Sequence, residues 1–392
     1  DHYMPNSGSE DVLPGNVHEC WSMLPAIAAV TDRLRIGSLV APTSVHHPAV
    51  LANRAATIDH ISEGRLVLGI GAGWQINEHH AYGIDLEAPG TRVSRFEEAI
   101  QVIRSLLSED RTDFRGDFYD ITDAPANPKP VQTPLPILVG TGSPRMLRIT
   151  ARHADEWNTW GAPDMAGGAL EKLHTACEQV GRDPATLWKS TQALVFMTDN
   201  AELAENIKGG DMGERSILGS NEQLVDEIGR YVELGFDELI VPDFTLGSPP
   251  DERQRSLDRL RDCRRVGDVV EVAAEVGAIL AEQRPDHLDR LFETADSRAG
   301  CFEVYAVRMV FVDLPTRADA EYETPLGDVI DRGCSVGEHG GVVHRSRSDE
   351  RPDAEAVGDR RDRRQHRPAF VDVAGKHVLA AGVRHVVVGV PE

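Results

Sequence analysis

The chain has 392 residues and a formal net charge of -23, which argues against nucleic acid as a partner because phosphate binding needs clustered Lys and Arg. Its five cysteines form no CxxC pair, so neither a disulfide framework nor a zinc or other metal site is expected, and a reducing, cytoplasmic compartment fits. No apolar run reaches the roughly 18 residues that cross a bilayer, so we expect no membrane partner.

Residues 17–265 alternate short apolar runs with stretches of helical periodicity, which is typical of repeated βα units and a parallel sheet. Strands of such a sheet are buried on both faces and therefore read as continuous aliphatic runs. The runs that meet this description are 34–40, 66–70, 137–139, 155–158, 193–196 and 239–241. The sequence thus predicts an α/β fold.

The segments between these runs carry helix signals. Pro48 begins one helix, in which Leu51, Ala55 and Ile58 recur on one face, and Gly64 stands where a C-terminal cap belongs. A second apolar stripe consists of Phe96, Ile100, Ile103 and Leu107. Ser220 and Gln223 have the spacing of a capping box, and aromatic, glycine and proline residues in 111–135 predict an inserted hairpin and loop.

The character of the chain changes near residue 266, so we predict one domain at 1–265 and a poorly structured C-terminal segment at 266–392. Residues 268–281 have a pattern that could still form a helix, whereas the charged run 346–367 is typical of disorder. Translation of GC-rich DNA in a wrong frame would give a similar composition. We assign no function to this segment.

Two glycine-rich turns are candidate ligand sites. Residues 69–74 follow a buried strand but lack the GxGxxG spacing of a dinucleotide fold, so a glycine loop at the carboxyl end of a barrel strand is the better interpretation. Residues 140–144 follow the next strand, and there Ser143 and Pro144 would begin a helix whose free amides favour a phosphate. The alternative for the second turn is an ordinary strand-to-helix connection.

Several motifs together resemble the luciferase-like monooxygenase superfamily, and most closely its branch that uses coenzyme F420, an 8-hydroxy-5-deazaflavin. They are 19–21 (ECW), 31–37 (TDRLRIG), 47–49 (HPA), 58–66 (IDHISEGRL), 77–83 (NEHHAYG), 128–132 (PKPVQ) and 154–158 (ADEWN). The resemblance covers residues 1–265 and implies a TIM (β/α)8-type barrel. Its first strand and most of its second are absent from the chain, which also does not begin with Met, so we expect a piece missing upstream and an open sheet edge between barrel strands eight and three.

The resemblance also implies roles for individual residues. His2 would lie against the deazaflavin ring and handle a proton, Leu39 and Val40 would form a non-proline cis peptide behind the ring, and Gly140, Thr141, Gly142 and Ser143 would take the cofactor phosphate. The remaining cofactor contacts implied are Asp1, Ala72, Gly73 and Asn77. Trp74 stands where a relative that oxidises a sugar phosphate has a glutamate, so we expect an apolar substrate wall there, with Trp157 also in the substrate pocket.

Three functions remain open at this point. The first is hydride transfer between F420 and a small organic substrate, and the second is a monooxygenase that uses reduced FMN and oxygen. The third is a truncated, inactive relic of such an enzyme. Relatives in the family are often dimers, so a homodimer is an expectation. The adjacent residues Glu78, His79 and His80 could suggest metal ligands, but neighbours on a helix point to different faces, so surface or supporting roles are expected instead.

Overall fold

The computed structural model describes residues 1–242, 245–247, 250–262, 270–272 and 306–311. Contacts between Cα atoms divide the chain into two units, Asp1–Tyr322 and Glu323–Glu392, and all described residues belong to the first. The predicted disordered run 346–367 therefore lies outside the described residues, as does most of the C-terminal segment.

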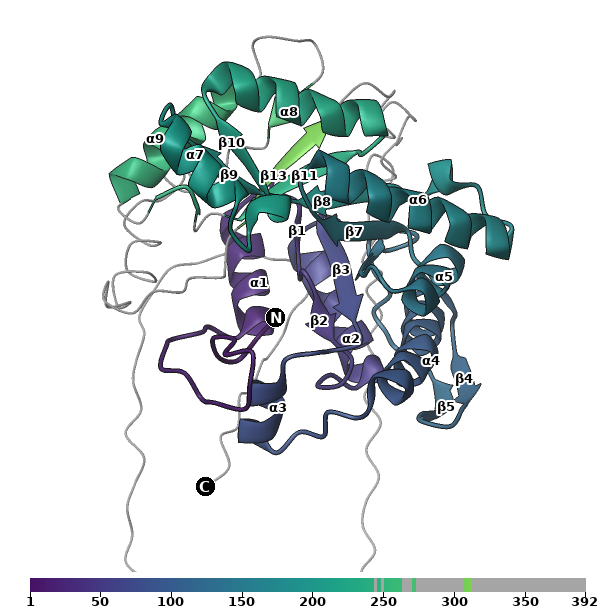
Figure 1. Ribbon diagram of the computed structural model, residues 1–392. Coiled ribbons are helices and arrows are strands. Elements are labelled where there is room, and N and C mark those ends of the chain that lie inside the picture. The colour runs from purple at the N-terminus through teal and green to yellow at the C-terminus, as the bar shows by residue number, and fades with distance from the viewer. Residues whose placement is uncertain (243–244, 248–249, 263–269, 273–305, 312–392) are drawn as a thin grey trace, which may run out of the picture. The chain divides into compact units, whose positions relative to one another are not determined.

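A parallel sheet forms the centre of the described unit, as the apolar runs predicted (Figure 1). Its parallel strands, in spatial order, are β1 (Ile36–Gly37), β3 (Leu66–Gly71), β6 (Ile137–Gly140), β7 (Glu156–Trp160), β8 (Trp188–Gln192) and β11 (Glu238–Pro242). The predicted strand at 34–40 is instead two short strands, β1 and β2 (Ala41–Pro42), which pair with successive parts of β3. This arrangement is the βα barrel pattern, with sequential strands as neighbours.

Strand β8 continues almost directly into β9 (Leu194–Met197), and β9 pairs in parallel with β10 (Ser216–Gly219). Beyond β11 the sheet gains β13 (Ala306–Phe311) and β12 (Val270–Val272), both antiparallel to their neighbours. Two expectations are thereby corrected. Residues 270–272 are extended rather than helical, and β13 occupies the outer edge of β11 that was expected to be open, because its backbone supplies the missing ladder partners.

Nine helices of the described residues connect these strands. They are α1 (Cys20–Val30), α2 (Pro48–Ile61), α3 (Ile76–Tyr82), α4 (Pro89–Ser108), α5 (Pro144–His153), α6 (Pro163–Val180), α7 (Ala201–Lys208), α8 (Asn221–Leu234) and α9 (Pro250–Asp262). Two short 3-10 turns, Pro184–Thr186 and Gly213–Arg215, lie between them. The predicted hairpin is present as β4 (Thr112–Arg115) and β5 (Asp120–Ala124). None of these helices is both long and apolar enough to span a bilayer.

The local signals act as the sequence predicted. Ser220 and Gln223 form a reciprocal capping box at the start of α8, which satisfies two backbone donors that the helix leaves free. The apolar stripe of α4 is buried along its length. One core cluster gathers α1, α2 and α4 against β3 and β6, and a second gathers α5, α6 and α8 against β7 and β11.

Candidate functional site

Val40 marks the point where three turns meet at the carboxyl end of the parallel strands. A Cβ at Gly71 would lie 2.8 Å from Val40 Cγ2, and a Cβ at Gly140 would lie 3.3 Å from Val40 Cγ1. The turns after β3 and β6 therefore converge on Val40, as the barrel hypothesis requires. The Leu39–Val40 peptide is cis, which confirms the bond expected from the resemblance.

Asp1 lies beside this point. Its backbone nitrogen is 3.4 Å from the carbonyl oxygen of Val40, and its side chain is completely buried. Asp1 Oδ2 accepts hydrogen bonds from Trp21 Nε1 at 2.9 Å and from His46 Nε2 at 2.6 Å, since a carboxylate only accepts. No donor among the described residues reaches the buried Asp1 Oδ1.

His46 is buried next to Asp1, and neither it nor Trp21 was singled out as a site residue by the sequence. Burial lowers the pKa of the His46 imidazole to about 4, and Arg54 acts in the same direction. Glu19 acts in the opposite direction, because a nearby negative charge favours the protonated ring. Neither residue has a local sequence signal, because Trp21 lies 20 positions and His46 lies 45 positions from Asp1, the partner that they share.

His2 follows Asp1 and is held by Glu78 of α3. His2 Nδ1 lies 3.0 Å from Glu78 Oε1, and the backbone nitrogen of Tyr3 donates to Glu78 Oε2 at 2.9 Å. The Glu78 side chain is only 2% exposed, whereas that of His2 is 25% exposed. Burial raises the pKa of Glu78, but the hydrogen bonds from His2 and Tyr3 outweigh it and hold this pKa below the usual carboxyl range.

The neighbours of Glu78 on α3 are also buried. The side-chain amide of Asn77 donates to the carbonyl oxygens of Pro5 at 2.8 Å and Asp11 at 3.2 Å. Asn77 was expected to contact the cofactor, but its amide hydrogens are engaged by the N-terminal segment. His79 Nδ1 donates to the Gln75 carbonyl at 2.6 Å, so its Nε2 accepts from Ser44 Oγ at 2.9 Å. Of the two expected roles, surface or supporting, the buried Glu78 and His79 have the supporting one, whereas His80 is exposed.

The glycine loop after β3 lies next to His2. Ala72 and Gly73 are half-buried, and Trp74 is 56% exposed, with its ring 5.7 Å from the His2 ring in an edge-on arrangement. Gly73 has a φ of +86°, and a Cβ there would lie 2.1 Å from Ser44 Oγ. The loop can therefore approach the segment after β2 only because residue 73 is glycine.

The turn after β6 leads into α5, with Ser143 at the N-cap and Pro144 at the first helical position. Gly142 and Ser143 are exposed, and the Ser143 side chain makes no capping hydrogen bond. The Thr141 amide donates to the Asn158 carbonyl at 3.1 Å, which ties the turn to β7. The start of α5 is thus an exposed helix N-terminus at the carboxyl end of the sheet, the kind of position that favours an anion.

Trp157 does not line this site. Its side chain is fully buried in the second core cluster, where it stacks on Phe236 with ring centroids 6.2 Å apart. Its Nε1 donates to the Thr141 carbonyl at 2.9 Å. The predicted substrate-pocket role is wrong, because Trp157 points from β7 toward the covering helices rather than toward the barrel interior.

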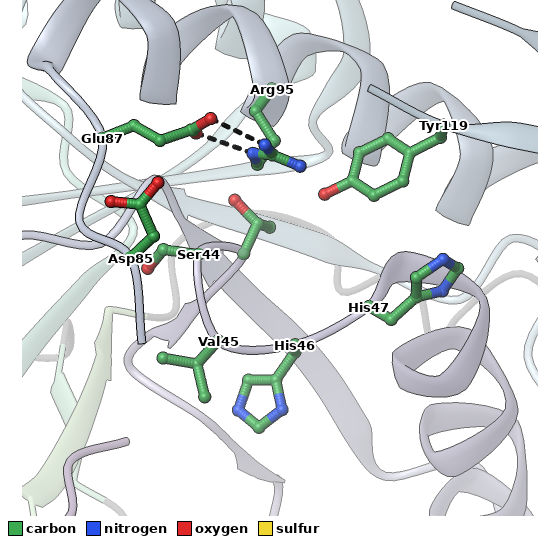
Figure 2. A pocket seen from close by; sticks show the side chains of 9 residues that line it. Ser44, Val45, His46, His47, Asp85, Glu87, Arg95 and Tyr119 are labelled. Carbon is green, nitrogen blue, oxygen red and sulfur yellow. Dashed lines mark hydrogen bonds and ion pairs between the residues drawn. The ribbon is translucent and has the colours of Figure 1, made fainter. Parts of the chain in front are cut away.

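A polar pocket of about 290 Å³ lies beside the site (Figure 2). It is lined by Thr43, Ser44, Val45, His46, His47, Asp85, Glu87, Arg95 and Tyr119. Arg95 makes a two-point ion pair with Glu87, with both contacts at 2.7 Å, so its charge is neutralised within the pocket wall. The predicted cofactor residues do not line this pocket, and His46 connects it to Asp1.

Comparisons with known proteins agree with this geometry. The chain is 32% identical over 213 residues to an F420-dependent glucose-6-phosphate dehydrogenase of Kineococcus radiotolerans, a match that covers 53% of this chain and 61% of the relative. It is 31% identical over 218 residues to the pyrimidine monooxygenase RutA of Stutzerimonas stutzeri, covering 52% and 58%. The chain thus spans about three fifths of the length of these curated relatives.

Solved structures share the fold. The coenzyme F420 dependent tetrahydromethanopterin reductase of Methanopyrus kandleri superposes with a TM-score of 0.52 and 16% identity, covering 69% of this chain and 88% of that one. The family model described as luciferase-like monooxygenase matches residues 1–208, which is more than half of the chain. With the barrel strands and their converging turns in place, the chain belongs to the luciferase-like monooxygenase family.

Proposed function

We propose that this protein is an oxidoreductase that transfers hydride between the deazaflavin F420 and a small organic substrate. The observation that carries the proposal is the convergence of Asp1, Gly71 and Gly140 around Val40 at one end of the parallel sheet, with His2 directly after Asp1 and held by Glu78. The carboxyl ends of barrel strands are where enzymes of this architecture build their active sites. The identity to F420-dependent relatives supports the choice of cofactor.

The residues present fit such a cofactor. A Cβ at Gly71 or Gly140 would crowd the Val40 side chain, so the two glycines let three turns pack closely together, and we propose that a flat ring lies against these turns. The buried Asp1 Oδ1, which no described donor reaches, can accept a hydrogen bond from a polar edge of that ring. Gly142 and Ser143, at the exposed start of α5, would receive the phosphate.

When bound, the deazaflavin supplies the carbon that accepts or donates hydride. The chain's own residues do the rest. His2 is partly exposed beside Trp74 and moves the proton that accompanies the hydride, because an imidazole nitrogen can act as either general base or general acid. Trp74 presents an apolar, half-exposed wall that suits a small apolar substrate better than a sugar phosphate.

Cofactor binding tests the proposal directly. F420 and FMN are titrated separately into the purified full chain, and binding is followed through the spectrum of each cofactor. We expect F420 to bind and FMN to bind more weakly. Small secondary alcohols and glucose 6-phosphate are then tested with oxidised F420, and cyclic enones with reduced F420, through the change in deazaflavin absorbance. Turnover is expected for an alcohol or an enone and none for glucose 6-phosphate.

The second candidate is an FMN-dependent monooxygenase, which the identity to a pyrimidine monooxygenase supports. Both cofactors present a planar tricyclic ring and a phosphate, so one set of turns suits either. Tight retention of FMN together with no F420 binding would establish this candidate in place of the first. Failure of the folded chain to bind either cofactor would favour the inactive relic.

A further inference from the structure

We propose that Glu78 is a positioning residue for His2, which fixes the tautomer in which Nδ1 carries the hydrogen and Nε2 is the nitrogen that exchanges protons with the substrate. The inference rests on the proposed function, since it assigns a second residue to the proton transfer that accompanies hydride transfer. It differs from a purely structural role because it specifies which ring nitrogen is free.

The geometry of the carboxylate supports this assignment. Both oxygens of Glu78 are occupied, Oε1 by His2 Nδ1 at 3.0 Å and Oε2 by the Tyr3 amide at 2.9 Å. An ionised carboxylate only accepts hydrogen bonds, so the shared hydrogen must lie on His2 Nδ1. The lone pair of a neutral His2 ring is then on Nε2.

The burial and charge of Glu78 point the same way. Its side chain is almost completely buried, and the hydrogen bonds from His2 and Tyr3 more than offset the effect of burial on its pKa, which lies below the usual carboxyl range. Glu78 is therefore negative at neutral pH. A buried negative charge 3.0 Å from the ring also stabilises the imidazolium that forms when Nε2 takes up a proton.

In the direction of substrate oxidation, a substrate hydroxyl group releases its proton to Nε2 as the carbon loses hydride. The His2 ring then carries two N–H groups and a positive charge opposite Glu78. In the reverse direction the imidazolium returns the proton from Nε2 to the developing alkoxide oxygen. The carboxylate keeps its charge in both directions, and only His2 changes its protonation.

Replacing Glu78 by glutamine tests whether Glu78 sets the tautomer of His2 or only holds the His2 side chain in place. A glutamine has one acceptor oxygen and one NH2 group, whereas two donors, His2 Nδ1–H and the Tyr3 amide, need acceptors. If the oxygen stays with the Tyr3 amide, the NH2 group faces His2 and favours the tautomer protonated on Nε2. The chain offers a matched control in Asp59, which is also buried and accepts from the backbone amide and the side-chain amide of Gln132 at 2.9 and 2.7 Å.

The test measures the His2 tautomer in the full chain by nitrogen-15 NMR of labelled histidine, with the His2→Gln spectrum identifying the His2 signals. We expect the wild type and Asp59→Asn to show hydrogen on Nδ1, and Glu78→Gln to shift toward hydrogen on Nε2. We expect kcat to fall about 100-fold in Glu78→Gln, the lower range of general acid–base catalysis, while KM changes less than about threefold. Glu78→Asp, which keeps the charge, should retain the wild-type tautomer.

Two results would overturn the proposal. One is a wild-type His2 with its hydrogen on Nε2, which needs no variant and so holds even if Glu78→Gln does not fold. The other is a folded Glu78→Gln with unchanged tautomer and unchanged kcat. Failure of the proposed function looks different, because the wild type would then bind no F420 while the tautomer measurement still reports on Glu78.

Discussion

Glu78 lies at the carboxyl end of the parallel strands, which we call the mouth of the barrel, and Asp59 lies away from it in α2. These two buried carboxylates have the same hydrogen-bonding pattern but different roles. Glu78 and Asp59 each accept one backbone amide and one side-chain donor at 2.7–3.0 Å. Asp59 holds Gln132, whose amide cannot exchange a proton near neutral pH. Glu78 holds His2, whose partly exposed imidazole can act as a general acid or base. The chemistry of a site therefore depends on what the carboxylate holds, since the attachment itself is the same.

The largest effect is expected when the titratable partner is removed. His2→Ala should lower kcat with a substrate from the panel by about 100-fold or more, because general acid–base transfer contributes about 10²–10⁴. Its unfolding free energy should also fall, because the buried Glu78 carboxylate loses its side-chain partner. Steady-state rates and urea unfolding measure the two quantities, and a His2→Ala protein that keeps full activity would contradict the role of His2.

The next largest effect tests the core away from the mouth. Trp157→Ala should lower the unfolding free energy by about 3–5 kcal/mol, the usual cost of truncating a fully buried large aromatic side chain. F420 affinity of the protein that remains folded should stay within a few-fold of wild type. Urea unfolding and spectral titration check these outcomes. A loss of substrate binding without loss of stability would instead support the predicted role of Trp157 in the substrate pocket.

A smaller effect is expected from adding a side-chain carbon where Gly71 contacts Val40. Gly71→Ala places a Cβ 2.8 Å from Val40 Cγ2, so it should destabilise the fold by about 1–3 kcal/mol and weaken F420 binding. Gly168→Ala is the control, because a Cβ there would meet no heavy atom within 4 Å apart from its chain neighbours and the backbone of its own helix. The control should be neutral or slightly stabilising, as alanine favours a helix. Equal binding losses in both variants would show that the convergence at Val40 is unrelated to the cofactor.

The smallest effect concerns pH and belongs to Glu78. Its pKa is lowered in the folded state, so its contribution to stability is present above the unfolded carboxyl pKa and is lost as pH falls through the folded pKa. The wild type should therefore lose stability on acidification below about pH 4.3 more steeply than Glu78→Gln. Urea unfolding at a series of acidic pH values checks this difference, and parallel curves would contradict it.

The elements that local signals define could be predicted from the sequence. Ser220 and Gln223 lie three residues apart, so their capping box needs no distant partner. The apolar runs predicted β3, β6, β7 and β11, because burial on both faces leaves continuous hydrophobic stretches. They missed the polar strand β8, and the run 193–196 lies in the separate β9–β10 sheet. The same property explains the error at Trp157. A strand that is buried on both faces gives no alternation to tell which residues face the interior and which face the helices.

The supporting residues of the site could not be predicted for a different reason. Glu78 contacts His2 and Tyr3 across 75–76 positions, and Asn77 reaches Pro5 across 72. No periodicity connects such distant segments, and three consecutive polar residues on a helix normally indicate a solvated face. Likewise, the pairing of β13 with β11 joins residues that lie far apart in the chain, such as Val310 and Glu238.

The short helix α3 joins two other segments of the chain, which make three with α3 itself, through consecutive side chains. Asn77 and Glu78 hold the N-terminal segment, and His79 holds Ser44 after β2. Because these hydrogen bonds share one rigid turn, loosening any of them should raise amide hydrogen exchange in all three segments together. The mouth of the barrel would then open and close as a single cooperative unit, with a ligand that bridges β2 and His2 slowing exchange across the whole of it.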